Sequence, residues 1–125
     1  MNLKNTFIEL DEKEAFNCLK NPSNRAFFLF FYTSQCSQCK IARARLDRLL
    51  QKCTFDVDFF TCNLDKAPAI AEYFGIHSVP VCMTYNQKCE QQRVEYGLKS
   101  EAVYESMTLG VNTQKGDPQS RLLGF

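Results

Sequence analysis

The chain has 125 residues and a mass of 14.4 kDa, and 45% of its residues are apolar while 23% are charged. This size and composition are typical of one globular domain and exclude wholesale disorder. Because 15 basic and 14 acidic side chains leave a formal charge of only +1, the composition gives no support for a nucleic-acid-binding or membrane-surface protein.

The first residues carry several acidic side chains and no long apolar run, so no secretory signal is expected. The most apolar stretch, residues 26–32, is far shorter than the roughly 20 residues that a membrane-spanning helix needs. We therefore expect a soluble cytoplasmic protein.

The first third of the chain predicts a strand, a helix and a second strand. A short strand is expected at residues 6–10, and Asp11 with Glu14 forms a capping-box pattern that begins a helix over residues 12–20. The near-continuous apolar run 25–33 predicts a buried strand, which must be covered on both of its faces.

A long amphipathic helix is predicted next, over residues 36–53. Its apolar positions recur at helical spacing: Cys39, Ala42, Leu46, Leu49, Leu50 and Cys53. Residues 55–63 predict another strand. A strand, a helix and a strand of these lengths indicate a βαβ unit with parallel strands.

The remaining elements complete an α/β pattern. A short helix is expected at residues 67–74, ended by Gly75. Strands 81–85 and 90–96 predict an antiparallel hairpin, and residues 100–107 predict the last helix. The order β-α-β-α-β-α-β-β-α indicates a mixed central sheet flanked by helices on both faces. We expect one domain over residues 1–109 and a flexible C-terminal tail over residues 110–125.

Seven cysteines are an odd number, so they cannot all be paired within one chain. Only Cys36 and Cys39 stand close together, as Cys-Ser-Gln-Cys at the start of the long helix. Residues i and i+3 are neighbours on a helical turn, which suits the Cα separation that a disulfide requires. This motif between strand and helix predicts a redox-active dithiol.

The two sulfurs are not equivalent. Cys36 lies at the predicted helix N-terminus, where unpaired N–H groups and the helix dipole stabilise a thiolate, and Lys40 adds a positive charge one turn later. Cys39 lies deeper, on the apolar stripe. We therefore expect Cys36 to be the nucleophile and Cys39 to be the resolving thiol.

The chain resembles the thioredoxin family over residues 6–107. The resemblance rests on the strand before Cys36-x-x-Cys39, on Asn63-Leu64-Asp65, on Tyr73-Phe74-Gly75-Ile76 and on Val79-Pro80. The spacing from Cys36 to Pro80 equals that of ordinary thioredoxins. The resemblance implies a thioredoxin fold and exchange of the dithiol with protein disulfides, driven by a reductase or another thiol electron donor.

By this resemblance, the Val79–Pro80 peptide bond should be cis and should face the dithiol. An extended substrate segment would bind there through main-chain hydrogen bonds. The implied substrate groove comprises Gln35, Ser37, Gln38, Ser78, Val79, Pro80 and Gly97.

The chain also departs from the family pattern. Gln35 replaces the tryptophan that usually precedes the first cysteine, and Ser37-Gln38 replaces Gly-Pro. Phe30 stands where thioredoxins bury an aspartate, and Thr61 stands where the partner lysine is common. Since Phe30 supplies no base, activation of Cys39 is expected to be slower or to depend on water.

Two rival functions follow. One is a redox-idle adaptor that binds partners through the same groove, and the other is an oxidant or isomerase-type exchanger. A metal site is not expected, because only one close cysteine pair exists. We expect a monomer that needs no cofactor beyond the redox-active Cys36–Cys39 disulfide. The other cysteines are interpreted as small buried hydrophobes, with Cys62 or Cys82 as regulatory thiols the alternative. His77 is interpreted as a surface histidine.

Overall fold

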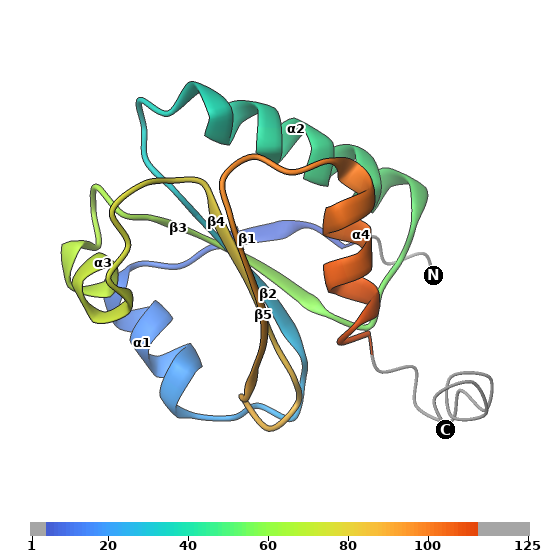
Figure 1. Ribbon diagram of the computed structural model, residues 1–125. Coiled ribbons are helices and arrows are strands. Elements are labelled where there is room, and N and C mark those ends of the chain that lie inside the picture. Colours follow the sequence, from blue (N-terminus) through green and yellow to red (C-terminus); the bar gives the residue numbers. More distant parts are fainter. Residues whose placement is uncertain (1–4, 113–125) are drawn as a thin grey trace.

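A computed structural model gives the structure of the protein and describes residues 5–112 (Figure 1). This part of the chain forms five strands and four helices, which alternate except that β5 directly follows β4. In chain order they are β1 (Phe7–Glu9), α1 (Glu12–Lys20), β2 (Phe27–Tyr32), α2 (Ser37–Lys52), β3 (Asp58–Asn63), α3 (Pro68–Phe74), β4 (Val81–Tyr85), β5 (Gln91–Tyr96) and α4 (Glu101–Leu109).

The strands form one mixed sheet in the order β1-β3-β2-β4-β5. Strands β1, β3 and β2 run parallel, whereas β4 is antiparallel to both β2 and β5. The predicted parallel βαβ unit and the predicted antiparallel hairpin are therefore both confirmed.

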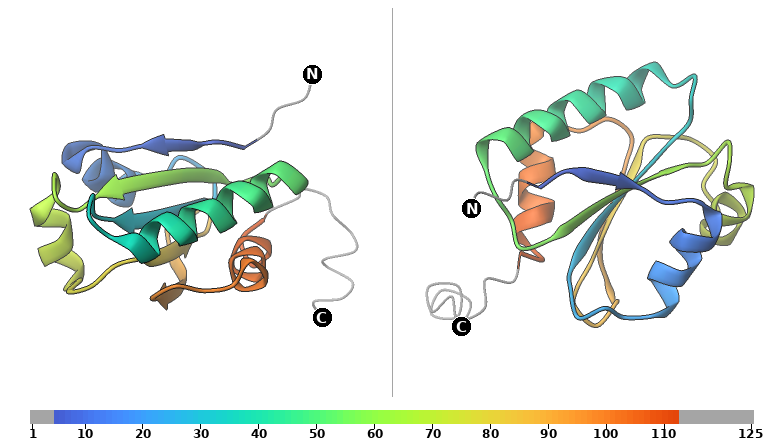
Figure 2. Two further views of the ribbon diagram at one scale, coloured as in Figure 1. Left: turned by 90° about the horizontal axis from the view of Figure 1, so that it is seen from above. Right: turned by 180° about the vertical axis from the view of Figure 1, so that it is seen from behind.

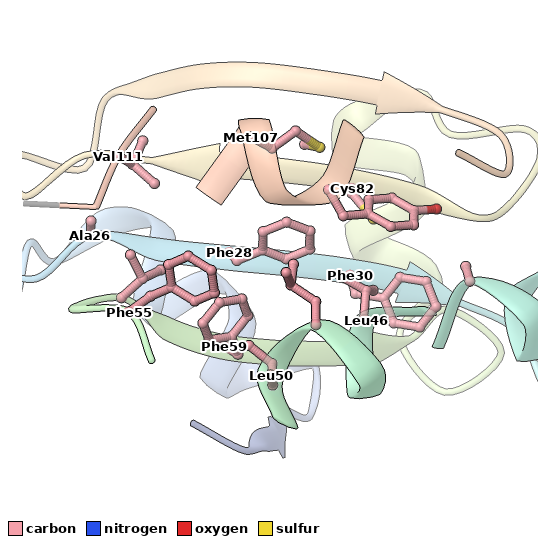
Figure 3. Close-up of a cluster of buried hydrophobic side chains, with 14 of the residues drawn as sticks. Ala26, Phe28, Phe30, Leu46, Leu50, Phe55, Phe59, Cys82, Met107 and Val111 are labelled. Carbon is pink, nitrogen blue, oxygen red and sulfur yellow. The ribbon is translucent and has the colours of Figure 1, made fainter. Parts of the chain in front are cut away.

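Strand β2 lies at the centre of the sheet, and its side chains alternate between two cores. Phe28 and Phe30 pack with α2 and α4 on one face (Figure 3), while Phe27, Leu29 and Phe31 pack against α1 and α3 on the other. Figure 2 shows helices on both sides of the sheet. The near-continuous apolar run is explained by this double burial, and the predicted fold class is confirmed.

Strand β3 begins at Asp58, three residues later than the sequence predicts. The main-chain groups of Phe55 and Val57 bond instead to the side-chain amide of Asn5, at 2.8–3.0 Å. A side chain thus satisfies these backbone groups in place of a neighbouring strand.

Packed structure continues beyond α4. Val111 is buried in the core beside α2 and α4, and the Asn112 side chain accepts a hydrogen bond from the Asp56 N–H at 2.6 Å. The predicted tail begins at residue 110, so its first residues contact the domain. Residues 113–125 of that tail lie outside the described residues.

Candidate active site

The cysteine pair lies where β2 ends and α2 begins. Cys36 is the N-cap of α2, with extended backbone angles (φ −90°, ψ 107°), and the Cys39 N–H donates to its sulfur at 3.0 Å. Cys36 and Cys39 are joined by a disulfide, with their Cα atoms 5.2 Å apart. An N-cap sulfur receives an orphan N–H of the first turn, which favours a thiolate there after reduction.

The environments of the two sulfurs differ. Cys36 is half-buried, whereas Cys39 is only 3% exposed and belongs to the core beneath α2. Lys40 is exposed. An incoming disulfide can therefore approach Cys36 but not Cys39.

The loop before Cys36 is held by residues at the end of β3 and just beyond it. The Ser34 N–H donates to the Asp65 carboxylate at 2.8 Å, and the Asn63 amide donates to the Ser34 hydroxyl at 3.1 Å. Asn63 itself accepts from the Asp65 N–H at 2.9 Å. The Asn63-Leu64-Asp65 segment thus fixes the position at which the chain enters α2.

Val79 and Pro80 bring a second segment to the dithiol. The Val79 carbonyl oxygen lies 3.7 Å from the Cys36 sulfur, and the Val79–Pro80 peptide bond is cis. The Gly97 N–H donates to the Pro80 carbonyl at 2.8 Å, which places the start of the β5–α4 loop beside this segment. Gly97 has φ +85°, a conformation that glycine adopts without strain.

The other residues of the predicted groove differ in how far they are exposed to solvent. Gln35, Ser37, Gln38 and Ser78 are exposed, and Val79 and Gly97 are half-buried. Pro80 is buried, so it shapes the backbone and offers little surface of its own. His77 is exposed, as a surface histidine would be.

A cavity of about 280 Å³ opens beside Cys39. Its lining contains cations and hydroxyl groups but no carboxylate: Phe30, Tyr32, Thr33, Ser34, Cys39, Lys40 and Arg43. Arg43 lies one turn beyond Cys39, pairs with Asp47 at 3.0 Å and covers the Phe7 ring at 4.7 Å. The cavity has room for water beside Cys39, which suits a site that lacks a buried acid.

A small hydrogen-bond network borders this cavity. One oxygen of Glu9 accepts from the Tyr32 hydroxyl at 2.7 Å and from the Thr61 hydroxyl at 2.8 Å. Burial, together with the hydrogen bond to Glu9, raises the pKa of Tyr32 to about 12. The phenol therefore stays neutral at physiological pH and holds its proton toward Glu9.

Sequence reasoning identified the dithiol but missed Arg43 and Glu9. Arg43 follows Cys39 by one helical turn, so its spacing was a usable signal. Glu9 lies on β1 and contacts Tyr32 on β2, and β3 lies between these two strands in the sheet. No local sequence pattern indicates that contact.

Among residues 5–112, no group of three or more histidine, cysteine, aspartate or glutamate side chains is arranged to hold a metal ion. Within the same residues, no helix has the length and apolar character to cross a membrane.

Comparison with known proteins agrees with this geometry. The thioredoxin family model matches residues 7–108. A mutant thioredoxin from Halobacterium salinarum superposes with a TM-score of 0.73 at 17% identity, over 90% of this chain and 96% of that one. The reduced thioredoxin pre-protein of Schistosoma mansoni gives a TM-score of 0.72 at 23% identity, over 84% and 97% of the two chains.

The oxidised mitochondrial thioredoxin 3 of Saccharomyces cerevisiae gives a TM-score of 0.67 at 22% identity, over 81% of this chain and 92% of that one. No curated protein matches the chain. At these identities the solved structures show a shared fold, and the family model carries the assignment.

The five-stranded sheet with a CxxC disulfide at the start of α2 defines a thioredoxin-fold protein of the thiol–disulfide oxidoreductase class. The chain belongs to the thioredoxin family, because the family model matches most of its length. The predicted resemblance is thereby confirmed.

Proposed function

We propose that the protein exchanges its Cys36–Cys39 dithiol and disulfide with disulfide bonds of other proteins. The observation that carries this proposal is the half-buried sulfur of Cys36 at the N-cap of α2, linked to Cys39 and 3.7 Å from the Val79 carbonyl. The family assignment supports the same chemistry.

In the reducing direction, the Cys36 thiolate attacks one sulfur of a substrate disulfide and releases the other as a thiolate. A mixed disulfide then joins Cys36 to the substrate. The Cys39 thiolate attacks the Cys36 sulfur, which re-forms the internal disulfide and releases the second substrate thiol. The substrate gains two electrons and two protons, and the protein loses them.

Substrate recognition is proposed for the surface around the dithiol. An extended segment would bond to the main chain at Val79 and lie across the exposed side chains of Gln35, Ser37, Gln38 and Ser78, with Pro80 and Gly97 shaping the floor. Such binding selects for an extended backbone more than for particular side chains.

The oxidised protein is proposed to be reset by a reductase or a small thiol, which supplies two electrons and two protons. We propose that it acts as a cytoplasmic monomer and that it needs no cofactor beyond its redox-active Cys36–Cys39 disulfide. The cavity beside Cys39 offers no carboxylate to take the Cys39 proton, so water in that cavity is the proposed acceptor.

Reduction of insulin by dithiothreitol tests the proposal. The wild-type protein should accelerate the reaction. Cys36→Ser should return it to the uncatalysed rate because the nucleophile is lost. Reduced Cys39→Ser, freed of dithiothreitol and then mixed with insulin, should accumulate a mixed disulfide that is visible by mass spectrometry. Full activity of Cys36→Ser would refute the proposed mechanism.

Two alternatives are separated by related measurements. The replacement of a buried acid by Phe30, which is 2% exposed, favours a redox-idle adaptor, and such a protein would not exceed the uncatalysed rate. An oxidant or isomerase would show a reduction potential well above the roughly −270 mV of thioredoxin. A redox titration of the Cys36–Cys39 pair measures this potential.

A further inference from the structure

Two cysteines that the active site does not use lie beside one another. Cys18 is in the last turn of α1, and Cys89 is in the turn between β4 and β5, 71 residues later. Both are free and half-buried. Figures 1 and 2 show the C-terminal end of α1 next to this turn.

The contacts between the two residues are direct. The Cys89 thiol donates to the carbonyl oxygen of Cys18 at 3.4 Å and to that of Leu19 at 3.1 Å. Cys89 has φ +64°, the left-handed conformation that glycine usually supplies. The turn therefore directs this thiol onto the end of α1 although a side chain is strained at that position.

A purely structural role accounts for the Cys89 thiol but not for the Cys18 thiol. The Cys89 thiol satisfies carbonyl groups that the end of α1 leaves unpaired, and any residue at position 18 would provide such a carbonyl. The sulfur of Cys18 has no part in that contact.

Cys18 carries a thiol of its own beside this contact. The Cys89 sulfur lies 3.4 Å from the Cys18 carbonyl oxygen, so the two residues are immediate neighbours in space. Burial raises the pKa of Cys18 to about 12, and the charge of Cys89 is the next cause of the rise.

Cys18 can also be reached from outside. It lines an open depression along α1, of about 780 Å³, together with Phe16, Asn17 and Asn21. A small disulfide can enter a depression of this size.

We propose that Cys18 and Cys89 form a second redox pair, which closes into a disulfide between α1 and the β4–β5 turn by exchange with a small-molecule disulfide such as oxidised glutathione. Burial raises the pKa of both thiols, so only a small fraction of either is ionised at neutral pH. The thiolate of one cysteine attacks the small disulfide and releases one glutathione thiolate. The other cysteine attacks the resulting mixed disulfide, forms the Cys18–Cys89 bond and releases the second glutathione. Two protein thiols are oxidised while one glutathione disulfide is reduced to two thiols.

This pair is separate from Cys36 and Cys39. Tyr85, the last residue of β4, pairs with Phe27 at the start of β2, whereas Cys36 follows the opposite end of β2. The two ends are about 20 Å apart, because β2 has six residues. The Cys18–Cys89 pair therefore does not depend on the proposed function of the active site.

Trypsin provides a clear assay of the full-length protein. Cleavage after Lys13 and Lys20 releases residues 14–20, and cleavage after Lys88 and Arg93 releases residues 89–93, so each peptide contains one cysteine. The protein is incubated with oxidised glutathione, its remaining thiols are blocked with N-ethylmaleimide, and the unreduced digest is analysed by mass spectrometry. We expect the two peptides to appear joined, two hydrogens lighter than their sum, and to separate after dithiothreitol treatment.

Two variants make the assay specific. Cys89→Ser keeps a hydroxyl donor for the end of α1 but cannot form the link, so the joined peptide should disappear. Cys53→Ser removes another half-buried free cysteine, at the C-cap of α2, and should leave the yield of the joined peptide unchanged.

Recovery of the two wild-type peptides only as separate species, blocked by maleimide or carrying glutathione, would overturn the proposal. Links from Cys18 to several other cysteines in comparable yield would also overturn it, because they would indicate nonspecific oxidation.

Discussion

Arg43 and Lys40 are the two cations that line the cavity beside Cys39, and no carboxylate lines this cavity. Arg43 also pairs with Asp47 at 3.0 Å, which offsets part of its charge. A positive charge there stabilises the Cys39 thiolate that must attack the mixed disulfide. We predict that Arg43→Gln lengthens the lifetime of the mixed disulfide about two- to fivefold, since one pKa unit corresponds to a tenfold change in thiolate and this arginine is partly screened by solvent.

Rapid acid quenching of reduced protein mixed with a peptide disulfide measures this lifetime, and its dependence on pH should move to higher pH in the variant. Arg48→Gln is the matched control, because Arg48 lies on the same helix with a 71% exposed side chain and pairs with Glu101 instead. If both variants changed the lifetime equally, or if only thermal stability changed, Arg43 would have a structural role alone.

The residues of the site differ in how far the sequence could predict them. Cys36 and Cys39 could be predicted because their function depends on a spacing of three within one helix. Arg43 also follows Cys39 by one turn of the same helix, so its position could be predicted from local spacing. It was missed because the helix contains several arginines, whereas it contains only one close pair of cysteines. Glu9 meets its partners through the pairing of strands in the sheet, and Cys89 meets α1 through a left-handed turn. Neither contact follows from a periodic pattern in the sequence.

At the scale of elements, the order and type of all nine were predictable because periodicity and capping residues agree. Two strand pairings were also predictable, β2 with β3 and β4 with β5, whereas the pairings of β1 with β3 and of β2 with β4 were not predicted. The Asp11–Glu14 capping box begins α1 as expected, and Gly75 ends α3. The largest boundary error is at the start of β3, where the side chain of Asn5 replaces a strand as the backbone partner. Such a long-range side-chain contact competes with local strand propensity and is not visible in the local sequence.

The left-handed end of α3 gives a test of that element. Gly75 has φ +65° and no atom within 4 Å of a Cβ placed on it, so backbone conformation alone opposes a side chain there. We predict that Gly75→Ala lowers the free energy of unfolding by about 1–2 kcal/mol, as measured by urea denaturation of the oxidised protein.

Gly110, at the end of α4, provides the control. Its φ of −65° is right-handed, and a Cβ there would meet ordinary contacts at 3.4 and 3.5 Å. Gly110→Ala should therefore leave stability unchanged or raise it by about 0.4–1 kcal/mol, because alanine restricts the unfolded chain. Equal losses in both variants would show that conformation at Gly75 is not the cause.

The two buried cores make the whole molecule sensitive to alkali. Burial raises the pKa of Cys62 from 9.0 to about 11, and burial raises that of Cys82 further still. Because these thiols hold their protons more tightly when folded, their contribution to stability is complete below pH 9. It is lost as the pH rises, since the unfolded chain then ionises first. We predict that the free energy of unfolding falls from pH 9 to 11, by up to about 1.4 kcal/mol per pH unit for each thiol.

Urea denaturation of the oxidised protein under argon, at pH values from 7 to 11, measures this dependence. Cys82→Ala should be less stable at pH 7, because it leaves a small cavity in the core beside α2 and α4. Its stability should nevertheless fall less steeply above pH 9, because one of the titrating groups is gone. Cys53→Ala removes a half-buried thiol at a helix end and should keep the wild-type slope. An equal slope in all three proteins would assign the loss to groups other than Cys82.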